Sequence, residues 1–266
     1  MSRIRDTFAE LKHSGRGGFI PFITAGDPDL VTTELLLIEL AAAGADIVEL
    51  GVPFSDPVAD GEVIQRASER ALQKGVTLSN ALRCASTVKQ HIDVPIVLFS
   101  YLNPLLKFGC DRLAEETRRA GIDAVLITDL IPEEAGPWIA AFREHGIDLI
   151  FLVAPTTSEE RLTYIAQQAS GFIYAISRTG VTGARNELPR NAELLVNRVR
   201  AVSDLPVAVG FGISTAEQVR QVWRFADAAV IGSALVSQIE KLAGSPDLAA
   251  RVGEFARSLL EPAPAG

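Results

Sequence analysis

The chain has 266 residues, of which 48% are hydrophobic and 22% charged, a balance that is typical of globular proteins. This length allows one large α/β barrel or two smaller domains. The formal net charge of -8 and the pI near 5.0 provide no basic face for phosphate backbones or anionic lipids, which argues against a non-specific nucleic-acid binder or a membrane-surface binder.

The N-terminal segment has apolar residues at helical spacing, with Ile4, Phe8 and Leu11 separated by charged residues. This pattern predicts an amphipathic helix and lacks the apolar run of a signal peptide. No later stretch approaches the length of a membrane span. Cys84 and Cys110 form no C-x-x-C motif, and we interpret them as reduced thiols. We therefore expect a cytoplasmic protein that begins with an extra helix.

Short β-branched or aromatic runs then recur along the chain, each followed by a longer amphipathic segment. They predict strands at residues 18–26, 46–52, 95–101, 123–129, 148–154, 172–177, 206–212 and 228–234. Several intervening helices exit through glycine into the next strand, as in RRAGIDA. Nearly continuous apolar strands, each paired with a helix, indicate an all-parallel sheet covered by helices.

About eight such units predict an α/β fold of the (β/α)₈ or TIM-barrel class, which typically spans ~250 residues. We expect residues 1–266 to form a single TIM-barrel domain that ends in a frayed tail, LLEPAPAG. The main alternative is an open doubly wound sheet, which would carry a glycine fingerprint after its first strand. That position reads ITAGDPDL and contains no such fingerprint.

Polar residues at the predicted C-terminal strand ends mark the expected active site, because TIM barrels build their sites there. They are Glu49, Asp56, Asp60, Tyr101, Thr128, Asp129, Tyr174 and Ser177. No lysine lies within a strand, and no histidine lies at these ends. These absences argue against a Schiff base, a histidine base and a zinc site. We therefore expect proton transfer by carboxyl groups, without a metal.

Glu49 is the strongest catalytic candidate because it ends an apolar run. It shares its parity with Ile47, so both side chains should point into the barrel, where burial would raise the carboxyl pKa. Such a group can donate and accept protons near neutrality. The alternative is a structural Glu that pairs with an arginine or caps a loop, but the adjacent strand ends carry neither Arg nor Lys.

The other aspartates have competing interpretations. Asp60 lies in a loop and either takes part in catalysis or caps the helix that begins near Glu62. Asp56, between Ser and Pro, is typical of a turn or an interface. Asp129 closes the fourth strand, and capping of the next helix explains it better than catalysis.

Glycines after the seventh and eighth predicted strands indicate a phosphate site. Gly210, Gly212, Gly232 and Ser233 would let backbone N–H groups approach a phosphate. Phosphate sites in this fold recur in these two loops together with a short extra helix, for which SALVSQIEKLAG provides room. The alternative is that the glycines only permit tight turns.

The loop at residues 178–189 is long and rich in Gly and Thr, which predicts a lid closed by Thr182 and Gly183; an ordinary surface loop is the alternative. The remaining mouth residues are apolar or aromatic and would suit a flat aromatic group. They are Phe22, Phe99, Tyr101, Leu126, Tyr174 and Phe211. The residues together predict a phosphorylated, partly aromatic substrate.

Five segments in this order resemble the tryptophan synthase alpha chain family: PFITAGDPD, VELGVPFSDPVADGEVIQRASERAL, SRTGVTGAR, VGFGIS and VIGSALV. The resemblance implies a lyase that cleaves indole-3-glycerol phosphate to indole and glyceraldehyde 3-phosphate by a retro-aldol reaction. It implies no cofactor in this chain. It also implies a partner, a pyridoxal-phosphate-dependent beta chain that receives indole in an alpha-beta-beta-alpha complex.

The same resemblance assigns residue roles. Glu49 matches the glutamate that handles the proton at indole C3, and Asp60 matches the aspartate that bonds the indole N–H. The other matches are an active-site tyrosine (Tyr174), a phosphate cradle (Gly183, Gly212, Gly232, Ser233), a lid threonine (Thr182) and indole-pocket positions (Phe22, Phe99, Leu126). Glu62 and Thr128 depart from the family pattern without removing a catalytic group.

Two other functions remain open from the sequence. One is another phosphate-binding barrel enzyme of amino-acid biosynthesis, which would be expected to use a strand-end lysine or a different acid–base pair. The other is a non-catalytic barrel that activates a partner enzyme. The presence of Glu49 and Asp60 together argues against the second.

Overall fold

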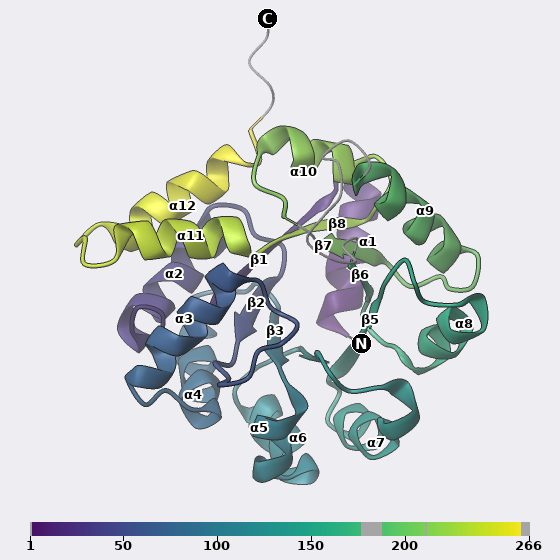
Figure 1. Ribbon diagram of the computed structural model, residues 1–266, viewed down its shortest axis with the longest axis horizontal. Coiled ribbons are helices and arrows are strands. Elements are labelled where there is room, and N and C mark those ends of the chain that lie inside the picture. The colour runs from purple at the N-terminus through teal and green to yellow at the C-terminus, as the bar shows by residue number, and fades with distance from the viewer. Residues whose placement is uncertain (1, 177–187, 211, 262–266) are drawn as a thin grey trace, which may run out of the picture.

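Eight parallel strands close into a barrel in sequence order, with β8 returning to pair with β1 (Figure 1). The computed structural model describes residues 2–176, 188–210 and 212–261. The strands are β1 (Gly18–Thr24), β2 (Val48–Gly51), β3 (Ile96–Ser100), β4 (Ala124–Ile127), β5 (Asp148–Val153), β6 (Ile173–Ile176), β7 (Val207–Gly210) and β8 (Ala228–Ile231). The prediction of an α/β TIM barrel is confirmed.

Helices surround the barrel, and the first of them lies across one of its ends (Figure 1). They are α1 (Arg3–Ser14), α2 (Leu30–Ala42), α3 (Glu62–Gln73), α4 (Leu78–Val88), α5 (Leu102–Phe108), α6 (Cys110–Arg119), η1 (Pro132–Glu134), α7 (Gly136–Glu144), α8 (Glu159–Gln168), α9 (Leu188–Arg200), α10 (Ala216–Trp223), α11 (Ser233–Leu242) and α12 (Leu248–Ser258). The predicted N-terminal helix is α1, and the predicted extra helix after the eighth strand is α11. Both predictions are confirmed.

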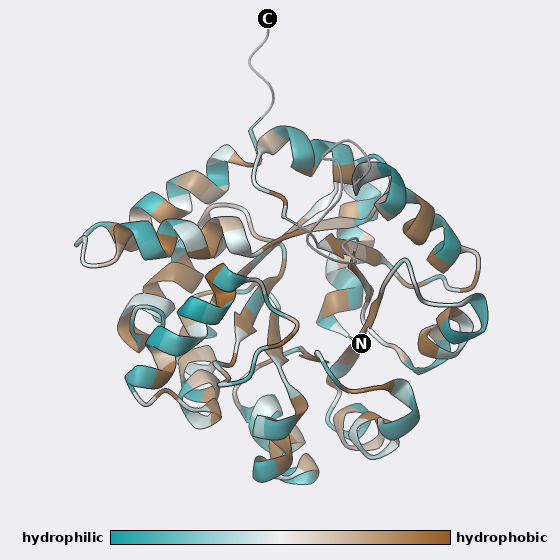
Figure 2. Ribbon diagram, viewed as in Figure 1, coloured by the Kyte–Doolittle hydropathy of each residue, from teal (hydrophilic) through white to brown (hydrophobic). Residues whose placement is uncertain are grey.

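The strands are buried on both faces, which explains their continuous apolar sequence (Figure 2). Their outward side chains pack under helices such as α2. That helix begins at Asp29, whose carboxylate accepts a hydrogen bond of 2.8 Å from the Thr32 N–H. It buries Leu36, Leu37 and Leu40 at helical spacing.

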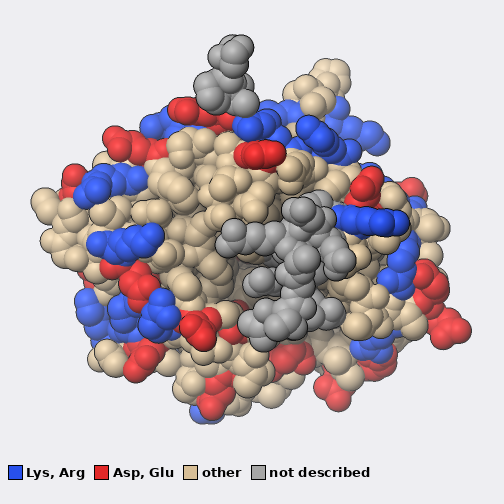
Figure 3. Space-filling view, turned by 45° about the horizontal axis from the view of Figure 1, so that its top comes forward, with Lys and Arg blue, Asp and Glu red and all other residues tan. Residues whose placement is uncertain are grey.

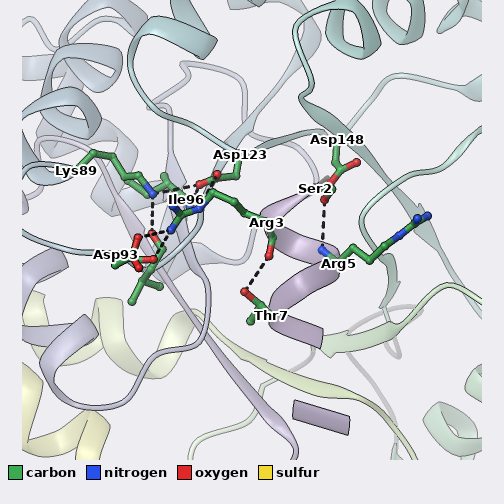
Figure 4. Close-up of polar contacts among 10 residues, drawn as sticks. Ser2, Arg3, Arg5, Thr7, Lys89, Asp93, Ile96, Asp123 and Asp148 are labelled. Atoms are coloured by element: carbon green, nitrogen blue, oxygen red, sulfur yellow. Dashed lines mark hydrogen bonds and ion pairs between the residues drawn. The ribbon is translucent and has the colours of Figure 1, made fainter. Parts of the chain in front are cut away.

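Helix α1 covers the N-terminal end of the barrel. Ile4, Phe8 and Leu11 join the cluster of inward-facing strand residues, and the Phe8 and Phe172 rings lie 5.6 Å apart between centroids. Polar residues anchor this end as well: Arg3 contacts Asp93 and Asp123, both outside the helix (Figure 4). The apolar residues at helical spacing near the N-terminus therefore form a helix that closes this end of the barrel, and we call α1 the plug.

Strand register decides which side chains face the opposite, C-terminal mouth. Ile47 lies in the inner cluster, and Glu49, two residues later, is opposite Phe22 of β1. Gly51 has room for no larger residue, because a Cβ there would lie 2.6 Å from the Phe22 ring. The predicted inward direction of Glu49 is thus confirmed.

Within the residues that the structure describes, no helix has the length and apolar character required to cross a membrane.

Candidate active site

A cavity of about 380 Å³ opens at the C-terminal ends of the strands, within the size range of small-molecule sites. It is lined by Phe22, Glu49, Ala59, Asp60, Gly61, Ile64, Phe99, Thr128, Leu152, Tyr174, Ile176, Gly210, Gly212, Val230, Gly232 and Ser233. The lining comes from all eight strands or their following loops, around the whole circumference of the barrel. The mouth predicted from the sequence is therefore one continuous site.

Glu49 lies at the inner wall of this cavity with 1% of its surface exposed. Neither carboxyl oxygen has a hydrogen-bond partner among the residues that the structure describes. Burial without a compensating cation raises the pKa of Glu49 to about 8. The alternative of a structural Glu paired with an arginine is not what the structure shows. At neutral pH this carboxyl group holds a proton that it can give away.

Asp60 enters the cavity from the loop between β2 and α3. Burial raises the pKa of Asp60 to about 6, and a hydrogen bond with the Tyr101 side chain opposes that rise. Helix α3 begins with Gly61 as its N-cap and has no side-chain cap, so Asp60 does not cap it. The two carboxyl groups of the cavity therefore have separated pKa values, an arrangement that assigns an acid and a carboxylate at pH 7.

Tyr101 supports the Asp60 loop from behind. It is 3% exposed, and its hydroxyl accepts a hydrogen bond of 3.0 Å from the Ala59 N–H. Its ring packs on Phe54 at 5.1 Å between centroids. Burial, followed by the nearby Asp60 charge, raises the pKa of Tyr101. Tyr101 therefore does not line the cavity, and it acts on the cavity through its contacts with Asp60 and the Asp60 loop.

Tyr174 lies at the opposite wall, on β6. Burial raises its pKa well above the ordinary value, and the charges of Glu49 and Asp60 act in the same direction. Gly210, on the neighbouring β7, provides the space for this tyrosine, because a Cβ there would lie 2.3 Å from the Tyr174 hydroxyl. Neutral Tyr174 thus shares the site with both carboxyl groups.

Aromatic and aliphatic side chains form the remaining wall. The Phe22 and Phe99 rings meet edge to face, with 5.2 Å between centroids. Leu152, on β5, is half-buried at the cavity. Leu126 was predicted for this wall but does not line the cavity, since it lies fully buried in the inner cluster beneath it. A flat apolar group would contact mainly the two phenylalanines.

The residues at the ends of β7 and β8 that are predicted to bind phosphate line the cavity. Gly212 has a φ of 42°, a conformation that favours glycine. Gly232 is the N-cap of α11 without a side-chain cap, and Ser233 is the first residue of that helix. The first turn of α11, which carries the positive end of the helix dipole, therefore borders the site.

No lysine or arginine is among the described lining residues, so backbone groups would provide the attraction for an anion. In the face shown in Figure 3, Lys and Arg side chains gather mainly along the periphery. Lys107 lies on α5, outside the lining. The described residues also contain no group of His, Cys, Asp or Glu that could hold a metal ion.

Several predicted residues lie elsewhere. Asp56 is exposed and accepts a hydrogen bond of 2.6 Å from the Ser55 hydroxyl, consistent with a turn role. Asp129 was expected to cap the next helix, but it accepts a hydrogen bond of 2.6 Å from the Leu102 N–H at the start of α5. This pairing arises because parallel strands bring the β4 end beside the preceding βα loop. Ser177, Thr182, Gly183 and Phe211, and most of the predicted lid, lie outside the described residues.

The structure also adds lining residues that the sequence reasoning did not select: Ala59, Gly61, Ile64, Leu152, Ile176 and Val230. Leu152, Ile176 and Val230 could have been found from strand parity, since each faces inward two residues after an inner-cluster residue or Tyr174. Ile64 required knowledge of where α3 begins and which way it turns.

Comparison with known sequences agrees with this geometry. Residues 8–262 match the family described as "Tryptophan synthase alpha chain". The chain belongs to the tryptophan synthase alpha chain family. The alpha chain of Geobacter sulfurreducens is 50% identical over 261 residues, which cover 98% of each chain. That of Citrifermentans bemidjiense is 49% identical over 259 residues, which cover 97% of each.

Solved structures show the same barrel. Tryptophan synthase subunit alpha from Legionella pneumophila superposes with a TM-score of 0.89 at 37% identity, covering 98% of each chain. A tryptophan synthase structure from M. tuberculosis in its aminoacrylate-bound form gives 0.87 at 37% identity, covering 97% of this chain and 100% of that one. As a tryptophan synthase alpha chain, this protein is a lyase that carries out the alpha reaction of tryptophan biosynthesis.

Proposed function

We propose that Glu49 and Asp60 carry out the retro-aldol cleavage of indole-3-glycerol phosphate to indole and glyceraldehyde 3-phosphate. The observation that carries this proposal is a buried glutamate that has no hydrogen-bond partner among the described residues, in one cavity with a second, more acidic carboxyl group. The pKa values of about 8 and about 6 give Glu49 a proton and Asp60 a charge at neutral pH.

The proposed reaction moves one proton out of Glu49 and one back into it. Glu49 first protonates indole C3, and the Asp60 carboxylate accepts a hydrogen bond from the ring N–H, whose positive charge it stabilises. The Glu49 carboxylate then removes the proton of the C3′ hydroxyl. The electrons of the C3–C3′ bond return to the ring as the aldehyde forms. Atoms and charge balance, and Glu49 is protonated again.

The remaining lining would bind the two ends of the substrate. Gly212, Gly232 and Ser233 would take the phosphate through backbone N–H groups and the α11 dipole, helped by Gly183 and Thr182 from the lid. Phe22 and Phe99 would contact the indole ring. Tyr174 would lie between these regions, and Phe211 and Leu126 would complete the enclosure. A bound phosphate and a bound ring would leave the scissile bond beside Glu49.

We also propose that indole passes to a tryptophan synthase beta chain in an alpha-beta-beta-alpha complex located in the cytoplasm. In this arrangement the pyridoxal phosphate belongs to the beta chain, and this chain itself holds no cofactor. Family membership supports the partner. Exposed apolar side chains near the mouth, Val58 at 87% and Leu106 at 57% exposure, are of the kind that a partner would cover.

Release of indole from indole-3-glycerol phosphate by the purified chain tests the proposed chemistry directly. We expect slow turnover by the free chain and faster turnover as a beta chain is titrated in. Absence of indole under both conditions would reject the assigned reaction and return the alternatives of a different barrel enzyme or a non-catalytic activator. Turnover without any gain from the beta chain would reject only the coupling.

A further inference from the structure

A cluster of four charged residues lies next to the cavity without lining it. We name it the α3–α11 charge cluster, and it consists of Asp27, Arg66, Arg70 and Glu240. Arg70 donates to both Asp27 oxygens, at 2.8 and 2.9 Å, and to Glu240 at 2.7 Å. Arg66 donates two further hydrogen bonds of 2.8 Å to the Glu240 carboxylate. Two forked guanidinium groups thus share one carboxylate.

The buried carboxylate of Asp27 depends on this cluster for its positively charged partner. Its side chain is 1% exposed, at the turn that follows β1. Arg70 donates all the hydrogen bonds that the structure shows for this carboxylate among the described residues. A buried carboxylate that loses its cation carries a large desolvation penalty. The position of Arg70, and with it the axial position of α3, is therefore tied to the β1 turn.

The cluster joins the two helices whose first turns form the site. Helix α3 begins at Glu62, two residues after Asp60, and α11 begins at Ser233, which lines the proposed phosphate cradle. Arg66 and Arg70 are four residues apart and project from one face of α3. Both reach Glu240 on α11. One set of contacts therefore fixes the relative position of the two helix N-termini.

Apolar packing between these helices is concentrated at their first turns, where the half-buried Val63 and Ile64 pack against a small cluster that includes Val236. The buried residues of α3 are Ala67, Ser68 and Ala71, all small. Small side chains form shallow ridges and grooves, so their contacts change little when a helix shifts along its axis. The forked contacts of arginine with carboxylates depend strongly on both distance and angle. The charge cluster is thus the part of the α3–α11 interface that fixes the distance and angle between the two helices.

We propose that Arg70 and Glu240 are positioning residues that hold Asp60 at a fixed distance from the phosphate cradle. This inference rests on the proposed function for the role of Asp60. It adds that neither residue contacts substrate and that each acts through the placement of α3. Loss of the cluster would leave substrate binding by the cradle largely intact and would misplace the carboxylate at the reacting ring.

The activity test compares Arg70→Met with a matched control, Arg119→Met, on the full chain. Arg119 also donates to two glutamates, Glu115 and Glu116, but on the exposed face of α6. We expect Arg70→Met to lower kcat for indole release about tenfold with a smaller change in KM, as expected for misplacement of a catalytic group. Arg119→Met should match the wild type. An unchanged kcat in Arg70→Met would overturn the proposal.

A double mutant separates positioning of Asp60 from a general loss of structure. If Arg70 acts through Asp60, Arg70→Met should cost less than about twofold when added to Asp60→Asn. Equal costs in both backgrounds would show that Arg70 acts independently of Asp60 and would overturn the proposal. Glu240→Gln should show the same non-additivity with a smaller single effect, of about threefold, because Arg70 retains Asp27.

Hydrogen exchange provides a readout that does not depend on turnover. Amides of residues 57–66 should exchange faster in Arg70→Met than in Arg119→Met and the wild type. Equal exchange in all three would contradict positioning of this segment. If the wild type releases no indole, the proposed function fails while exchange still decides the role of the cluster. If Arg70→Met does not fold, Arg70→Lys and Glu240→Gln undergo the same measurements, with faster exchange again expected.

Discussion

Buried carboxyl groups at the N-terminal end of the barrel have polar partners, whereas Glu49 in the cavity at the opposite end has none among the described residues. At the N-terminal end, Asp123 accepts from the Ile96 N–H at 3.0 Å and contacts Lys89 at 3.3 Å and Arg3 at 3.2 Å (Figure 4). Asp148, at the same end, accepts a hydrogen bond from the Ser2 hydroxyl. At the C-terminal mouth, Glu49 has no such partner among the described residues, although it is more deeply buried.

We interpret this difference as one between carboxylates with a structural role and a carboxyl group proposed to take part in the reaction. Removing the carboxylate from such a partnered group leaves its partners unpaired and destabilises the folded state, whereas a buried carboxyl group without partners is itself unfavourable when ionised. The unfavourable placement of Glu49 keeps its proton available near neutral pH. Substitutions at the mouth should therefore change activity, and substitutions at the opposite end should change stability.

The largest expected effect is that of Glu49→Gln on turnover. Removal of the group proposed to donate and accept the proton should lower kcat for indole release by about 10³-fold or more. Steady-state assays with the beta chain present would measure it, and circular dichroism would check that the barrel is retained. A variant with more than about a tenth of the wild-type rate would contradict the assigned role.

The same substitution should change the pH dependence of stability. The folded state holds the Glu49 proton up to about pH 8, while the unfolded chain releases it near 4.5. Stability from this group is therefore complete below pH 4.5 and is lost as pH rises to 8, by up to ~1.4 kcal/mol per unit. Urea unfolding at pH 5.5 and 8 should show a smaller loss in Glu49→Gln; equal losses would refute the raised pKa.

Asp60→Asn should lower kcat by about 10²-fold, because a neutral amide stabilises developing charge on the ring less than a carboxylate does. The KM should change less, since phosphate and ring contacts remain. Initial rates over a range of substrate concentrations would separate the two constants. A normal kcat would leave Asp60 without a part in the reaction.

Tyr101→Phe should have a moderate effect with a defined direction. The Tyr101 hydrogen bond lowers the pKa of Asp60, so its removal should raise that pKa above about 6. Because the proposed reaction requires an ionised Asp60, the acidic limb of the kcat/KM profile should move to higher pH. Activity near pH 7 should fall only a few-fold. An acidic limb that stays in place, or moves lower, would disprove the connection.

The smallest effect on activity is expected at the opposite end of the barrel. Asp123→Asn removes a carboxylate whose side chain is 9% exposed and leaves its Arg3 and Lys89 partners without it. We expect a loss of roughly 2 kcal/mol in the free energy of unfolding. The value of kcat should remain at the wild-type level. A loss of turnover without a loss of stability would contradict the idea that carboxylates at this end serve stability and those at the mouth serve activity.

Much of the barrel could be predicted from the sequence because periodicity acts locally. Continuous apolar runs reflect strands buried on both faces, and the parity of Ile47 and Glu49 gave the inward direction of the carboxyl group. The predicted strands extended beyond the observed ones, as with 46–52 against Val48–Gly51. The flanking residues keep single backbone hydrogen bonds to the neighbouring strands, from the Asp46 N–H to Phe19 and from the Val52 N–H to Phe99, but lie outside the regular ladder.

The remaining site features depend on contacts between distant segments. Neither the Tyr101 contact with the Asp60 loop nor the Asp129 contact with α5 follows from local sequence. The depth of Leu126 depends on barrel layering, which places it one layer below the cavity. The charge cluster joins residues 43 and 170 positions apart, so no local pattern could have shown it.

The plug formed by α1 has a kinetic consequence. Because Ile4, Phe8 and Leu11 seal the N-terminal end, substrate and both products exchange at the same mouth in the described part of the chain. A phosphorylated product that remains on the α11 side occupies the space that the next substrate needs. Glyceraldehyde 3-phosphate should therefore inhibit competitively, and the rate of its departure can limit the turnover of a barrel that is open at one end.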